Sequence, residues 1–110
     1  MNEPAQPPLN VEHEEAARRF CVKLSGYEAC LMYRRTGKEI DLYHTYVPEV
    51  FRGRGMAEQL CHAAFEHAKA NRLTVLPSCS YVAGAYLTRH PEHEPLTKRG
   101  GPMSNPLVSG

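Results

Sequence analysis

The stretch Val47-Pro48-Glu49-Val50-Phe51-Arg52-Gly53-Arg54-Gly55-Met56-Ala57 marks the point where the pattern of the chain changes. Before it, apolar residues such as Ile40 and Leu42 alternate with polar ones, which is typical of a half-buried strand. After it, the chain runs to Ala70 without a glycine or a proline. We therefore interpret this stretch as the junction between a strand and a helix.

The helix that begins after Gly55 has one apolar face. Its apolar residues recur at intervals of three and four, at Ala57, Leu60, Cys61, Ala64 and Ala68. The other side carries the polar residues Glu58, His62, Glu66 and Lys69. This spacing predicts an amphipathic helix from Gly55 to about Ala70 that packs on other elements through its Ala-rich face.

Three strands precede the junction. Alternating apolar residues predict strands over 20–24, 30–33 and 40–47. Turn residues at Ser25-Gly26 and at 36–38 separate them, so they can form an antiparallel meander that Pro48 ends. His44 falls on the alternation of Ile40 and Leu42. This position predicts a core or half-buried histidine, with a general base as the alternative.

A fourth strand and a second helix follow the first helix. Leu73 to Leu76 is short and apolar, and Pro77 stops it, so this strand can lie parallel to the third one. Ser80 can cap a helix from Tyr81 to about Arg89, which His90-Pro91 ends. The order β-β-β-α-β-α predicts an α/β domain of the α+β type with a mixed sheet.

Composition sets the domain limits and excludes some partners. The chain has 110 residues and a formal net charge of +1, which argues against nucleic acid or anionic lipid as the main partner. Residues 1–10 and 97–110 have the composition of a flexible leader and tail, which leaves 11–96 as one folded domain. The N-terminus lacks the apolar region of a signal peptide, and no apolar run is long enough to span a membrane.

The cysteines and histidines point to neither a disulfide framework nor a metal site. The four cysteines form no C-x-x-C pair, which argues against a zinc knuckle and a thioredoxin-like site. Their even number would permit two disulfides, but because a secretory signal is absent we expect reduced thiols in a soluble intracellular protein, cytoplasmic, nuclear or both. His62 and His67 are five residues apart and share no helix face, while His90 and His93 straddle Pro91. We therefore predict no metal site.

The junction itself has the features of an anion cradle. Gly53 and Gly55 allow close approach of the backbone, and the first turn of a helix presents unpaired N–H groups. Arg52 and Arg54 add positive charge, although a tight turn with solvated arginines is the simpler alternative. A Walker A loop is absent, and the third glycine of a dinucleotide fingerprint would fall on Glu58.

The junction matches a third known phosphate-binding pattern. Arg52-x-x-Gly55-x-Ala57 resembles the Q/R-x-x-G-x-G/A signature of the GNAT acetyltransferase superfamily. The strings His44-Thr45-Tyr46-Val47-Pro48 and Pro77-Ser78-Cys79-Ser80-Tyr81-Val82 look like its short single-domain branch, which includes plant proteins. The resemblance covers about 11–96 and implies a compact GNAT-like fold whose third and fourth strands splay apart to hold acetyl-CoA.

The resemblance also implies which residues bind the cofactor. The pyrophosphate of coenzyme A would be held by backbone groups of the junction. These belong to Arg52, Gly53, Arg54, Gly55, Met56 and Ala57. The end of the third strand, at Thr45, Tyr46 and Val47, would pair with the pantetheine arm, and the helix from Tyr81 would form the opposite wall. The N–H near Val47 would polarise the thioester carbonyl.

Cys79 is the candidate catalytic residue. It stands between the short strand and the second helix, and a helix N-terminus lowers the pKa of a thiol. The resemblance implies that Cys79 protonates the departing thiolate or accepts the acetyl group itself, while a small buried thiol is the alternative. Tyr81 and Tyr86 are other candidate acids, and Asp41 and Glu49 are other candidate bases.

The expected function is therefore the transfer of an acetyl group from acetyl-CoA to an amine. The acceptor is either a small amine or a lysine of a protein, including a basic protein. A coenzyme A-binding or protein-interaction module without turnover is the alternative, since so short a chain leaves little wall for an acceptor pocket. The sequence leaves the acceptor and the oligomeric state open.

Overall fold

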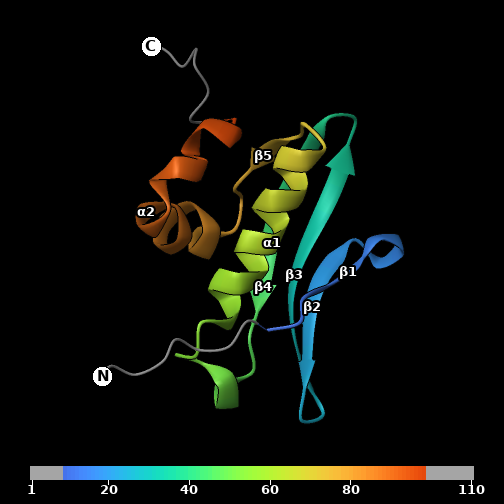
Figure 1. The fold of residues 1–110 in the computed structure, drawn as a ribbon, viewed down its shortest axis with the longest axis vertical. Coiled ribbons are helices and arrows are strands. Elements are labelled where there is room, and N and C mark those ends of the chain that lie inside the picture. Colours follow the sequence, from blue (N-terminus) through green and yellow to red (C-terminus); the bar gives the residue numbers. More distant parts are fainter. Residues whose placement is uncertain (1–8, 99–110) are drawn as a thin grey trace.

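The computed structural model describes residues 9–98 and contains one five-stranded sheet with helices packed beside it (Figure 1). The strands are β1 (Glu12–Glu14), β2 (Arg19–Leu24), β3 (Tyr27–Thr36), β4 (Glu39–Tyr46) and β5 (Thr74–Leu76). The helices are η1 (Glu15–Ala17), η2 (Glu49–Phe51), α1 (Met56–Ala70), η3 (Tyr81–Tyr86), α2 (Leu87–Arg89) and η4 (Pro91–Leu96).

The sheet has the mixed topology that the sequence predicted. Its strands lie in the order β1-β2-β3-β4-β5, antiparallel from β1 to β4, with β5 parallel to β4. The two predicted turns join β2 to β3 and β3 to β4, with Ser25 at φ 53° and Gly26 at φ 81° in the first. Strand β1 was not predicted, because three residues are too few to show an alternation.

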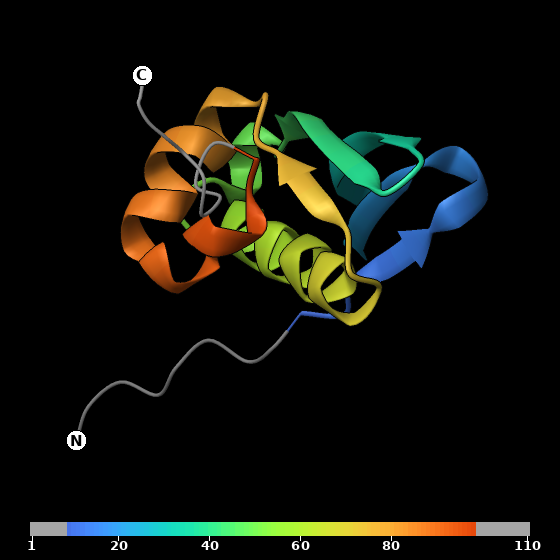
Figure 2. The ribbon, with the colours of Figure 1, turned by 90° about the horizontal axis from the view of Figure 1, so that it is seen from above.

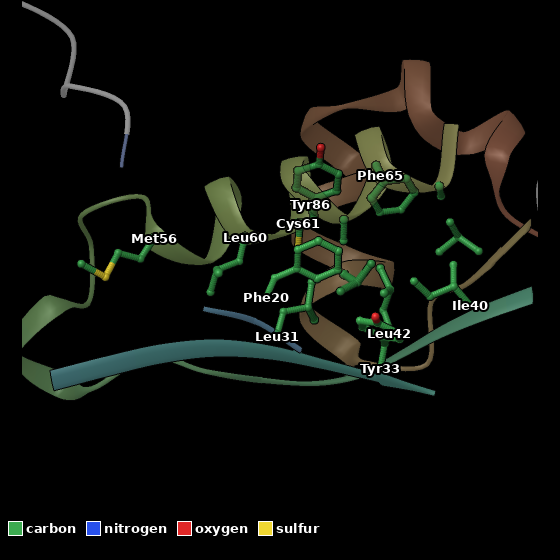
Figure 3. Packing of buried hydrophobic residues seen from close by; sticks show 14 of the residues in the cluster. Phe20, Leu31, Tyr33, Ile40, Leu42, Met56, Leu60, Cys61, Phe65 and Tyr86 are labelled. Carbon is green, nitrogen blue, oxygen red and sulfur yellow. The ribbon is translucent and has the colours of Figure 1, made fainter. Parts of the chain in front are cut away.

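Helix α1 covers one face of the sheet, and the core lies between them (Figures 2 and 3). Leu60, Cys61, Ala64 and Ala68 are fully buried, as the helical spacing predicted. Ala57 is only half-buried, because it stands in the first turn beside a pocket. Met56 and Phe65 widen the apolar stripe and also enter the core.

The opposite face of the sheet holds a disulfide, which corrects the prediction of four reduced thiols. Cys21 and Cys30 stand directly opposite each other on β2 and β3, with their Cα atoms 4.2 Å apart, and their sulfur atoms are bonded. A sequence shows the number of cysteines but not the strand register that brings two of them together. Ion pairs of Arg19 and Lys23 with glutamates lie on the same face.

A β-bulge in β4 overturns the prediction for His44. Met32 pairs with His44 and Tyr33 pairs with Leu42, so Tyr43 is the extra residue. An extra residue shifts the alternation by one, and every later side chain changes face. His44 is therefore exposed on the face away from α1, while Thr45 lies opposite the buried Leu31 on the α1 side.

The C-terminal segment flanks α1 and β5 (Figure 2). Residues 80–89 are helical, but 81–86 form a π-helix, and Ser80 is itself helical without a side-chain cap, so the predicted cap is wrong. The helical segment ends at His90-Pro91 as predicted, and η4 follows.

The two predicted flexible ends fall mostly outside the described residues. Residues 1–8 of the predicted leader and residues 99–110 of the predicted tail lie there. Within the described ends, the N–H of Leu9 donates to Oε1 of Gln59, and Thr97 is buried in a parallel bridge with Val75. Across residues 9–98, no helix has the length and apolar character that a membrane crossing needs.

Candidate functional site

The site begins where β4 and β5 separate. They pair only from Glu39 to Asp41 on β4, and one further hydrogen bond of 2.9 Å joins the N–H of Cys79 to the carbonyl of Leu42. Pro77 has no N–H to extend the ladder, and the bulge at Tyr43 turns β4 away. Within residues 9–98, no strand pairs with this edge of β4 beyond Leu42.

A pocket of about 580 Å³ occupies this end of the sheet. It brings together most of the residues that the sequence singled out for binding. Those that line it are Thr45, Tyr46, Val47, Arg52, Gly53, Gly55, Met56, Ala57 and Tyr81. Phe51, Glu58 and Arg89 also line it and were not predicted. The pocket thus joins the end of β4, the start of α1 and the helical segment after β5.

The start of α1 presents free backbone donors to the pocket. Gly55 precedes the helix at φ 79°, and the N–H of Gln59 makes the first intrahelical bond, to the carbonyl of Gly55. The N–H groups of Met56, Ala57 and Glu58 therefore have no partner within the helix. A Cβ atom at Gly53 or Gly55 would meet no atom within 4 Å, so their left-handed backbone, not crowding, favours glycine.

The two arginines of the junction have different positions. Arg52 lines the pocket, and its Nε donates to the carbonyl of Val47 at 3.2 Å, which links the loop to the end of β4. The guanidinium of Arg54 lies 5.4 Å from the centre of the Phe51 ring and borders a second, neighbouring pocket instead. The structure therefore separates two residues that the sequence had placed in one cradle.

An unpredicted ionic group stands at the mouth of the pocket. The carboxylate of Glu58, in the first turn of α1, is hydrogen-bonded to Nε2 of His90 and lies 3.4 Å from Nη1 of Arg89. The bond to Glu58 raises the pKa of His90. These two partners offset a negative charge that would otherwise oppose anion binding. They are more than 30 residues from Glu58, so no local pattern could reveal the group.

Cys79 lies behind the pocket and does not line it. Cys79 is half-buried, and its Sγ is 3.3 Å from Oγ1 of Thr45, so this contact joins β4 to the segment that follows β5. Thr45 does line the pocket, so Cys79 stands one side chain away from it. The structure thus places Cys79 at the opening between the strands, as the sequence suggested, but behind Thr45.

The two tyrosines of the C-terminal helical segment lie in different surroundings. Tyr81 lines the pocket, and burial raises the pKa of its hydroxyl group, which therefore keeps its proton at neutral pH. Tyr86 is fully buried, and its hydroxyl is 2.9 Å from Nδ1 of His93. Of the two alternative acids considered from the sequence, only Tyr81 faces the pocket.

Comparisons with known proteins agree on one family. The model of the GCN5-related N-acetyl-transferase family matches residues 19–96. The protein NATD1 of Homo sapiens is 41% identical over 78 residues, which cover 68% of this chain and 69% of NATD1. NATD1 of Gallus gallus is also 41% identical over 78 residues, with coverage of 68% and 71%.

A solved structure is similar over most of its length. It is the solution structure of a GCN5-like protein from Staphylococcus aureus, which has 26% sequence identity and a TM-score of 0.62. The match covers 84% of this chain and 90% of the other. The mixed sheet and its helices therefore follow the same overall arrangement in both proteins.

Proposed function

The chain belongs to the GCN5-related N-acetyltransferase (GNAT) family, and we propose that it binds acetyl-CoA in the pocket beside β4 and transfers the acetyl group to an amine. The observation that carries this proposal is the pocket itself, which unites the end of β4 and the start of α1 with Tyr81 and Arg89 from much later in the chain. An elongated ligand with an anionic end needs backbone donors at that end and an open strand edge beside the rest, and these segments supply both.

The residues of the pocket fit the parts of coenzyme A. The free N–H groups of Met56, Ala57 and Glu58 and the guanidinium of Arg52 suit the pyrophosphate, because a helix N-terminus favours negative charge. The unpaired edge of β4 at Thr45 to Val47 suits the amide groups of the pantetheine arm, as in strand addition. Tyr81 closes the opposite side.

The reaction needs one bond formed, one bond broken and two proton movements. Acetyl-CoA supplies a thioester whose carbonyl carbon is attacked by a neutral amine, so that a C–N bond forms and the C–S bond breaks. The amine loses a proton to water or a base, and the thiolate of coenzyme A gains one. The protein's part is to position both reactants and to let the N–H of Val47 polarise the carbonyl.

Two groups are candidates for the proton donor. Tyr81 lines the pocket and is protonated at neutral pH, as a general acid must be. Cys79 stands behind Thr45 and would act as the acid, or as a transient acetyl carrier, after a small movement of Thr45. The acceptor proposed here is a protein lysine, including one on a basic protein, or a small amine.

Binding and turnover can be measured separately on the full chain. Calorimetry with coenzyme A and with acetyl-CoA tests the pocket, and release of free thiol in the presence of lysine peptides and polyamines tests transfer. Binding together with amine-dependent thiol release supports the proposal. Binding without release from any amine rejects the transfer step and favours a coenzyme A-binding module, while absence of binding rejects both.

A further inference from the structure

Three metal-ligating side chains from two separate elements converge outside the acetyl-CoA pocket. His62 and Glu66 lie one turn apart on α1, and His93 approaches them from η4. Their ligand atoms, one from each residue, all lie within 4.8 Å of one another, and Nε2 of His93 is 3.8 Å from Oε2 of Glu66. None of the three lines the pocket proposed for acetyl-CoA.

His93 is held in place by the core. It is only 7% exposed, and its ring stacks on Phe65 with centroids 5.0 Å apart. Its Nδ1 is hydrogen-bonded to the hydroxyl of Tyr86 at 2.9 Å, so its Nε2 faces Glu66 (Figure 3 shows Phe65 and Tyr86). When Nδ1–H donates to Tyr86, Nε2 carries the lone pair that a metal needs. Such a bond on the second nitrogen is the usual support of a ligating histidine.

We propose that His62, Glu66 and His93 form a binding site for a divalent transition metal, with Zn²⁺ as the preferred ion. Two imidazoles and one carboxylate are a donor set that suits Zn²⁺, and three protein ligands leave a fourth position for water. Glu66 follows His62 by four residues and so lies on the same face of α1. The spacing of the histidines alone did not reveal the site, because its second ligand on α1 is a glutamate and its third ligand comes from η4.

The side chains need only a small adjustment to reach bonding distance. Ligand atoms around a tetrahedral zinc lie about 3.4 Å apart, given metal–ligand distances of about 2.0–2.1 Å. The present spacing is larger, but His62 and Glu66 are exposed and can rotate toward the fixed His93.

A metal at this site would strengthen the attachment of η4 to α1. Helix η4 and the following Thr97 and Lys98 hold the C-terminal end of the described chain against β5 and α1. A metal that joins His93 to α1 would fasten this segment to the helix. Because it would bind the folded chain and not the unfolded one, it would raise the melting temperature.

The test is a titration of the 110-residue chain, without an affinity tag, with zinc chloride after treatment with a chelator. We expect one Zn²⁺ per chain in the wild type and at least a tenfold loss of affinity in His62→Ala and in Glu66→Gln. Both residues are exposed, so these variants should fold normally, which circular dichroism can check. His44→Ala and Glu49→Gln are matched controls, because they remove an exposed histidine and an exposed glutamate elsewhere.

Melting curves provide a second readout that does not depend on activity. Zinc should raise the melting temperature of the wild type and of both controls, and should leave His62→Ala and Glu66→Gln unchanged. The proposal is wrong if the wild type binds no zinc at micromolar concentrations. It is equally wrong if His62→Ala binds zinc as tightly as the wild type, or if only Cys79→Ser removes the binding, since the ion would then lie elsewhere.

Discussion

The two halves of β4 have opposite surroundings. From Glu39 to Leu42 the strand is held on both edges, by β3 and by β5 with Cys79, and Ile40 and Leu42 are fully buried. From Tyr43 to Tyr46 it pairs with β3 alone, and the side chains have changed face at the bulge. Ile40 and Leu42 of the first half belong to the core, and Thr45 and Tyr46 of the second half line the pocket.

This difference shows how one strand serves both stability and binding. Where both edges are paired, the backbone donors and acceptors are used within the sheet and are unavailable to a ligand. Where β5 has separated, the same groups can bind a ligand at no cost to the sheet. The bulge decides which side chains face the opening, so it puts Thr45 there and turns His44 away.

The largest expected effect is on the first half of β4. Leu42→Ala should lower the free energy of unfolding by about 3 kcal/mol, because it leaves a cavity in a fully packed position. Tyr46→Ala, in the exposed second half, should cost less than about 1 kcal/mol. Denaturant unfolding measures both. Similar losses in the two variants would contradict the division of the strand into a core half and a pocket half.

The next effect is on catalysis at the opening. The substitution that removes the proton donor, Tyr81→Phe or Cys79→Ala, should lower turnover by about a hundredfold or more while coenzyme A affinity holds. Tyr81 lines the pocket and Cys79 lies behind Thr45, so we expect the larger loss in Tyr81→Phe. Steady-state kinetics with a fixed amine provides the comparison.

Cys79→Ser separates the two roles proposed for the thiol. A hydroxyl can donate a hydrogen bond but is a poor acetyl acceptor, so partial activity favours the acid role. An acetyl adduct on the Cys79 peptide, detected by mass spectrometry and removed by hydroxylamine, favours the carrier role. If Cys79→Ala and Tyr81→Phe both turn over at the wild-type rate, neither residue takes part in the chemistry.

A smaller effect is expected at the start of α1. Gly55→Val should weaken coenzyme A binding by about tenfold or more, because a branched residue disfavours φ 79° and places its side chain at the anion site. Gly26→Val is a matched control with φ 81° and equally open space, in the distant β2–β3 turn. Calorimetry on folded protein distinguishes them, and equal affinity in both variants would place the pyrophosphate elsewhere.

Charge at the junction should have a modest effect. Arg52→Ala should weaken coenzyme A binding about threefold, more at low salt than at high salt, because an exposed charge is screened by ions. Arg54→Ala should change affinity little, since Arg54 stacks near Phe51 outside the pocket. Titrations at two salt concentrations test both, and a larger loss in Arg54→Ala would reverse the assignment of the two arginines.

The smallest effect concerns the ionic group at the pocket mouth. The hydrogen bond to Glu58 raises the pKa of His90 above the ordinary histidine value of 6.5. The pair therefore makes its full contribution to the stability of the fold at pH values below 6.5. This contribution is lost as the pH rises through the raised pKa of His90. In Glu58→Gln, an NMR titration should find the pKa of His90 closer to 6.5. An unchanged pKa would mean that Glu58 does not hold His90.

The elements of the fold could be predicted because local patterns specify them. The alternation around Phe20 and Ile40, the turn residues Ser25-Gly26 and the spacing along α1 each depend on neighbours within a few residues. The glycine junction could be recognised for the same reason, since the demand for a left-handed backbone is local. The local pattern accounts for the junction residues that line the pocket, whereas Thr45, Tyr46, Val47 and Tyr81 were named only through the family resemblance.

The tertiary structure alone decided the features that depend on pairing between distant segments. The register of β2 and β3 joins Cys21 to Cys30, and the bulge at Tyr43 exposes His44. The docking of the last helices brings His90 to Glu58, and His93 to His62 and Glu66. Each contact arises from packing across the fold, and a pattern of neighbouring residues carries no record of it. The sequence by itself determined strands β2 to β5, helix α1 and the glycine junction, whereas the packing decided strand β1 and which side chains meet around these elements.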